Sequence, residues 1–148
     1  MKKRLLIPLL FISAILSGGA FAADDHSHGH EAQGAENGLT GLSLNHGQPW
    51  EMDEHTRTMS KQMRETFFSG DHGSLEGLTS MGTELEHQMQ DLIKGCTMTG
   101  QAHDQLHVFL NTHVPTINAL ATADNYKVAR ENAILLKGQL ETYQKHFK

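Results

Sequence analysis

The chain has 148 residues, and its 17 Asp and Glu against 12 Lys and Arg give a formal net charge of −5 at pH 7. This acidic balance disfavours nucleic acids and anionic membrane surfaces as partners. One cysteine excludes an internal disulfide bond, whereas 11 histidines and 7 methionines supply many metal-binding donors.

The first 22 residues have the form of a secretory signal peptide. Basic residues 2–4 precede an apolar run at 5–16, and Ala-Phe-Ala at 20–22 fits the small-x-small pattern of a signal peptidase site. We expect cleavage before Ala23 and a periplasmic protein with a net charge near −8, since the signal holds three of the 12 basic residues and no acid. No later stretch is apolar and long enough to predict a membrane span, so no membrane insertion is expected after cleavage.

Residues 23–44 are expected to form a disordered, His-rich tail, because they are polar and contain few apolar groups. His26, His28 and His30 alternate in this tail and are candidates for weak chelation of a divalent ion. If processing also removed Ala23, His26 would be the third residue. The terminal amine, two backbone amides and its imidazole could then surround Cu(II) or Ni(II) in a square plane. The alternative is a solvated linker with incidental histidines.

Residues 45–148 are expected to fold as an all-α, up-down-up-down antiparallel four-helix bundle. Apolar residues at spacings of three and four predict helices at about 51–68, 75–94, 101–121 and 125–146. Pro115 lies inside the third pattern and is expected to kink that helix or split it in two. The predicted core stripes include Met63 and Phe67, then Leu78, Gly82, Leu85, Met89 and Leu92, then Leu106, Leu110, His113, Ile117 and Leu120, then Ala129, Ala133, Leu136 and Leu140.

The densest group of metal-binding donors follows the second predicted helix, where Cys96, Met98, His103 and His107 lie within 12 residues. Thiolate, thioether and imidazole together favour copper, as Cu(I), and Cys with two or three His also suits Zn(II). In an antiparallel bundle, this loop shares an end with the start of the first helix and the end of the last. We therefore predict a mononuclear copper or zinc site formed by Cys96, His107, Met59 and His146, with Met98 or His103 as alternates.

Several short segments resemble a family of exported four-helix proteins from Gram-negative bacteria. They are Leu44 to Trp50 with Asp53, Arg57 and Met59, then Cys96, then Asp104 to His107, and Tyr143 to Phe147. The resemblance covers about residues 44–147. It implies a periplasmic bundle and supplies no activity.

The last helix also resembles the end of cytochrome b562, a periplasmic four-helix protein that binds haem through a Met of the first helix and a His of the last. Met52 or Met59 and His146 are the corresponding candidates. However, Gln144 takes the place of the haem histidine when the two ends are aligned on Tyr143. The chain has no C-x-x-C-H motif, which excludes covalent c-type attachment.

Three functions follow from these features. The first is metal binding for buffering, resistance or sensing, the second is electron transfer by haem b, and the third is a structural or partner-binding role without a metal. An enzyme is not expected, since no phosphate loop or nucleotide fingerprint is present. Glu84 and His87 form only one E-x-x-H pair, whereas a di-iron bundle needs two. His113 is expected to be a core histidine bonded to a backbone carbonyl or a Glu.

Overall fold

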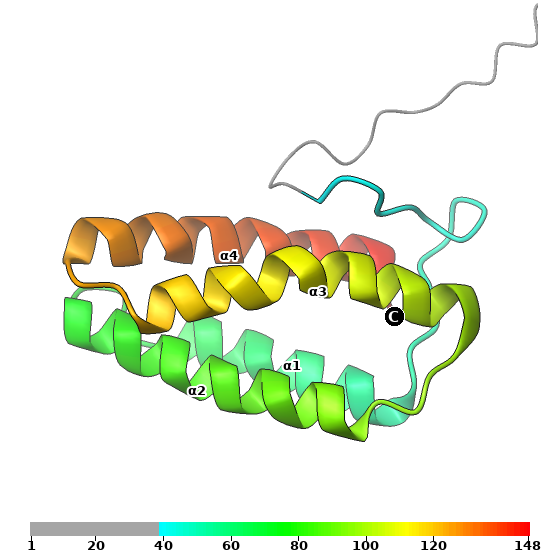
Figure 1. Ribbon diagram of the computed structural model, residues 1–148, viewed down its shortest axis with the longest axis horizontal. Helices are drawn as coiled ribbons and strands as arrows, with labels where there is room; N and C mark the ends of the chain where they lie inside the picture. The colour runs from blue at the N-terminus through cyan, green and yellow to red at the C-terminus, as the bar shows by residue number, and fades with distance from the viewer. Residues whose placement is uncertain (1–38) are drawn as a thin grey trace, which may run out of the picture. The chain divides into compact units, whose positions relative to one another are not determined.

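A computed structural model describes residues 39–148, which contain four α-helices packed against one another (Figure 1). The helices are α1 (Glu54–Ser69), α2 (Leu75–Gly95), α3 (Gly100–Ala121) and α4 (Tyr126–His146). The predicted all-α four-helix bundle is confirmed. None of the described helices is long and apolar enough to cross a membrane. The predicted signal peptide and the histidines at 26, 28 and 30 lie outside the described residues.

Three of the four helices begin after a side chain that caps the first turn. Asp53, Ser74 and Asn125 each accept a hydrogen bond from a backbone N–H of the helix that follows. The cap places the start of α1 at Glu54 rather than near Glu51. The residues just before the cap are extended because they pair with the end of the chain.

Pro115 does not split the third helix, so that part of the prediction is wrong. α3 is a single helix that continues through the proline, although the proline ring cannot donate a backbone hydrogen bond. The hydroxyl of Thr116 donates to the carbonyl of Thr112 at 2.9 Å. Beyond the proline, Ile117 and Leu120 are 1% and 0% exposed, so core packing holds the second half of the helix in place.

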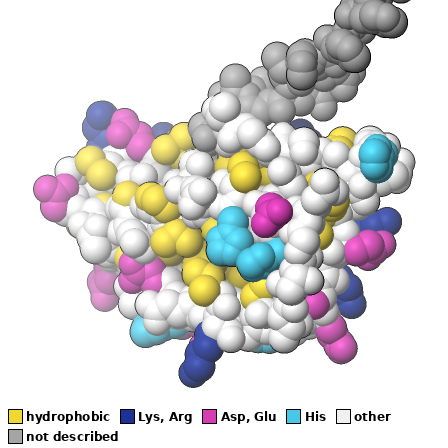
Figure 2. Space-filling model, turned by 45° about the vertical axis from the view of Figure 1, so that its right-hand side comes forward, with side chains coloured by type: hydrophobic (Ala, Val, Ile, Leu, Met, Phe, Trp, Pro, Cys, Tyr) yellow, Lys and Arg dark blue, Asp and Glu magenta, His cyan; other side chains and the backbone are white. Residues whose placement is uncertain are grey.

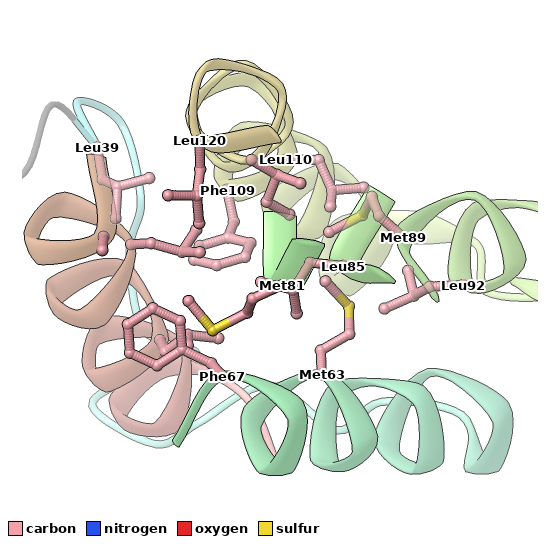
Figure 3. Packing of buried hydrophobic residues seen from close by; sticks show 14 of the residues in the cluster. Leu39, Met63, Phe67, Met81, Leu85, Met89, Leu92, Phe109, Leu110 and Leu120 are labelled. Atoms are coloured by element: carbon pink, nitrogen blue, oxygen red, sulfur yellow. The ribbon is translucent and has the colours of Figure 1, made fainter. Parts of the chain in front are cut away.

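The core is built mainly of Leu, Met and Phe side chains, and all four helices contribute to it (Figure 3). The stripes predicted from spacing are the buried faces of these helices, and Phe109 and Met81 join them. Leu39 and Leu42 are also buried, although we expected both in the disordered tail. The packed region therefore begins by Leu39, ahead of the expected boundary at 45, because these two leucines find apolar surface on the bundle.

The segment before α1 forms a tight turn and then pairs with the end of the chain. Asn45 and Gln48 exchange backbone hydrogen bonds of 2.8 and 2.9 Å around two residues with positive φ, which include Gly47 at 81°. The backbone N–H of Trp50 then donates to the carbonyl of His146 at 2.7 Å, and the N–H of Lys148 donates to the carbonyl of Trp50 at 2.9 Å. The Leu44 to Trp50 segment thus ties the start of α1 to the end of the chain, at one end of the bundle.

His113 is buried between α3 and α4, as expected of a core histidine, but its partner is an amide side chain. Its Nδ1–H donates to Oε1 of Gln139 at 2.8 Å. The amide of Gln139 donates in turn to the hydroxyl of Thr116 at 2.9 Å. Because each of these polar groups has a partner, the network can remain in an apolar core.

Candidate metal site

The imidazoles of His103 and His107 meet on the first turns of α3. Residues four apart on a helix share one face, and here the two Nε2 atoms are 3.0 Å apart. The rings are nearly perpendicular, with centroids separated by 4.4 Å. His107 is exposed and His103 is half-buried. Figure 2 shows adjoining histidine side chains with hydrophobic side chains around them.

The distance between the two nitrogens sets the geometry of any shared ion. Metal–nitrogen bonds are about 2.0–2.1 Å long, so nitrogens 3.0 Å apart subtend an angle of about 90° at the ion. Such a pair occupies neighbouring corners of a tetrahedron or a square plane. Without a metal, one Nε2–H donates to the other ring. With a metal, both Nε2 atoms would be deprotonated and each proton would sit on Nδ1.

Within residues 39–148, no third His, Cys, Asp or Glu side chain joins this pair. Among the described residues, no group of three or more His, Cys, Asp or Glu side chains is placed to hold one ion. The predicted combination of Cys96, His107 and His146 is therefore not assembled. Each of the three side chains has its own local contacts: Cys96 packs against the core, His107 meets His103, and His146 bonds to its own helix.

Cys96 packs against the core, and His146 forms a hydrogen bond within its own helix. Cys96 follows the last residue of α2, is partly buried against the core, and lies close enough to Tyr143 to influence the pKa of its hydroxyl. The Nδ1–H of His146 donates to the carbonyl of Thr142, one turn back on α4, at 2.9 Å. The lone pair of a neutral His146 is consequently on Nε2.

The two methionines of the predicted site are partly buried and pack against the hydrophobic core. Met59 lies on α1, and Met98 lies in the loop between α2 and α3. Methionine commonly fills irregular gaps in a core, and this packing accounts for both side chains without a metal. Of the six predicted ligands, only His103 and His107 have ring nitrogens within hydrogen-bond distance of each other.

Asp53 fixes the loop that carries both sulfur donors, a role that the sequence analysis did not assign. One carboxylate oxygen accepts the N–H of Thr56 at 2.7 Å, and the other accepts the N–H and the hydroxyl of Thr97, both at 2.8 Å. Burial raises the pKa of Asp53, but the hydrogen bonds from Thr56 and Thr97 outweigh it and hold the pKa well below its usual range. An Asp just ahead of a helical pattern was the available signal.

An Asp53→Asn variant is expected to lose about 1–2 kcal/mol of unfolding free energy at neutral pH, because an amide has one acceptor oxygen and no charge. The folded-state pKa lies below the unfolded value of about 3.9, so this stability is present above pH 4 and is lost as the pH falls further. Urea unfolding from pH 7 to 3 measures it, and the difference from wild type should shrink with pH. Asp124→Asn, in the exposed turn before α4, is the control and should change little. A constant difference would contradict the role assigned to the charge.

His55, another imidazole at this end of the bundle, has a structural role. Its Nε2–H donates to the carbonyl of Asp91 at 2.9 Å. Its ring lies directly against Gly95, where any Cβ would collide with it. Gly95, the last residue of α2, thus permits close contact between α1 and α2.

Comparison of the chain with protein-family models, curated proteins and solved structures finds no match. The resemblances to exported bundles and to cytochrome b562 stay predictions that rest on short segments. The fold and the site together define an all-α bundle that carries paired imidazoles on its third helix.

Proposed function

We propose that the protein binds a transition-metal ion at His103 and His107, copper first and zinc second, and that it buffers or passes on this ion in the periplasm. The observation that carries the proposal is the 3.0 Å separation of the two Nε2 atoms. Helical spacing holds both rings on one face, so little rearrangement is needed to admit an ion. Imidazole suits both metals, and nitrogen sites bind Cu(II) most tightly among the first-row divalent ions.

The geometry favours Cu(II) over the Cu(I) expected from the sequence. Linear coordination of Cu(I) needs nitrogens on opposite sides of the ion, whereas these two occupy neighbouring positions. With Cys96 packed beside the core, the soft thiolate no longer supports Cu(I) at this pair. We propose that water supplies the remaining ligands, which suits a site that takes up and releases its ion.

Competition titration tests the site. The mature protein is titrated with Cu(II) and with Zn(II) against a chelator of known affinity. The double variant His103→Ala, His107→Ala should lose about 100-fold or more in affinity, because even an outer-shell partner of a metal ligand is worth about 10–100-fold. His87→Ala removes a single exposed histidine of α2 and should have no effect. Wild-type affinity in the double variant would reject the proposal.

Two further variants locate the ion. Cys96→Ser should retain the affinity, since the thiol does not belong to the pair. Replacing the three tail histidines by Ala should likewise retain the affinity, since the tail does not belong to the pair. If Cys96→Ser loses the ion and the double histidine variant keeps it, the metal binds at the Cys96 thiol instead. Electron paramagnetic resonance of the Cu(II) form should show coupling to two imidazole nitrogens.

The other two functions have less support from the packing. A core cavity lined by Met63, Phe109 and Tyr143 has a volume of about 20 Å³, and neither Met59 nor His146 lines it. Pockets for organic ligands are about 300–1,000 Å³, so a haem inside this core would require the helices to separate. A structural role without a metal would be favoured if neither Cu(II) nor Zn(II) raised the melting temperature.

A further inference from the structure

A pocket of about 310 Å³ lies along the seam between α1 and α4. These two helices pack on each other less closely than on the rest of the bundle, and in Figure 1 they lie behind α2 and α3. The first turns of α1 and the end of α4 form its walls. The pocket is separate from the histidine pair, which lies on α3.

Four cationic side chains line this pocket, and no Asp or Glu side chain does. They are Arg57, Lys61, Arg64 and Lys148, one third of the 12 Lys and Arg in a chain whose net charge is negative. The two lysines form exposed ion pairs at the rim, of the kind that salt and solvent weaken. Positive charge is therefore concentrated at this pocket, although the chain as a whole is acidic.

The two arginines have no carboxylate partner among residues 39–148. Arg57 donates from Nη1 to the carbonyl of Met52, which orients its side chain. The guanidinium of Arg64 lies over the ring of Phe68, 5.1 Å from its centroid. Each guanidinium has five N–H donors in a planar fork that matches carboxylate and phosphate oxygens, so donors are left over for a ligand.

Two buried hydroxyl groups add hydrogen-bonding capacity at the inner wall. Ser60 Oγ and Tyr143 OH are fully buried, and within the described part of the chain neither forms a hydrogen bond of regular geometry, although Ser60 lies close enough to Tyr143 to lower the pKa of its hydroxyl. Burial raises the pKa of Tyr143, so its hydroxyl keeps its proton at neutral pH and can donate. Both residues line the 310 Å³ pocket. A hydroxyl that is buried without a regular hydrogen bond is costly, so a small movement that brings an anionic oxygen to Tyr143 OH would be favourable.

We propose that this pocket binds a small organic oxyanion. Arg57, Arg64 and the Tyr143 hydroxyl would hold its phosphate or carboxylate group, and the ring of Phe147 would contact its apolar body. The volume lies at the lower end of the range for small-molecule sites, which suits a compact ligand. Charge-assisted hydrogen bonds from arginine account for the choice of an anion, and the aromatic wall accounts for the choice of an organic one.

Calorimetric titration of the mature protein with phenyl phosphate, benzoate, inorganic phosphate and benzyl alcohol tests this proposal. Phenyl phosphate or benzoate should bind, and the stronger of the two identifies the anionic group. Benzyl alcohol should not bind, because it lacks the charge. Inorganic phosphate should bind about tenfold more weakly than phenyl phosphate, because it cannot contact the aromatic wall. Equal affinity for the two phosphates would overturn the assignment of an organic ligand.

Arg64→Gln should weaken binding about tenfold, since a hydrogen bond to a charged group is lost. Tyr143→Phe keeps the ring in the core and should weaken binding severalfold through the hydroxyl alone. Arg130→Gln removes a cation elsewhere on α4 and is the matched control. The double histidine variant of α3 should bind the anion normally, which separates this site from the metal proposal. Wild-type affinity in Arg64→Gln, or no binding of any anion by the wild type, would overturn the proposal.

Discussion

A Gly82→Ala variant is expected to lose about 2 kcal/mol of unfolding free energy, although alanine is the better helix former by about 1 kcal/mol. Gly82 lies in the middle of α2, on the face that meets the end of α3. A Cβ atom there would be 2.5 Å from the backbone nitrogen of Ala121 and 2.7 Å from its Cα. Backbone atoms of a packed helix cannot rotate away as a side chain can, so the helices would have to separate.

Urea unfolding followed by circular dichroism at 222 nm measures this effect. Ser80→Ala, at an exposed position of the same helix, is the matched control. It brings the helix-forming advantage of alanine without the collision, so its stability should be unchanged or slightly higher. A Gly82→Ala protein as stable as wild type would show that α2 and α3 do not approach as closely as described.

The wild-type protein is expected to lose about 3 kcal/mol of stability through His113 alone as the pH falls from about 6.5 to 4. Burial lowers the pKa of His113 from 6.5 to about 4, and the hydrogen bond to Gln139 offsets this only in part. Between these values the unfolded chain binds a proton that the native core does not accept. The unfolded state therefore binds more protons, and stability rises with pH across this window.

Unfolding free energies at pH 7, 5.5 and 4.5 for the wild type and His113→Gln measure this linkage. The variant keeps an amide donor for Gln139 but has no titrating ring, so its stability should change less with pH. Carboxylates titrate in both proteins, and the difference between the two curves isolates His113. His87→Gln, at an exposed site on α2, should follow the wild type. Parallel curves for wild type and His113→Gln would contradict the buried, neutral histidine.

The candidate site was predictable in part. The spacing of His103 and His107 was visible in the sequence, and helical geometry alone places them on one face. Cys96 directly follows α2 and is partly buried against the core, whereas His107 is exposed. Proximity to one end of a bundle does not determine which way each side chain points. That direction depends on local partners, such as the Thr142 carbonyl that holds His146.

Local periodicity determined the four helices and most of the core of this protein, because the three-four spacing of apolar side chains requires one buried face per helix. It also determined the core position of His113. Only the tertiary structure decided the start of α1, the burial of Leu39 and Leu42, and the basic pocket between α1 and α4. Each of these depends on contacts between residues far apart in the chain. Such contacts form because they lower the free energy of the whole folded chain, and a local sequence pattern does not carry that information.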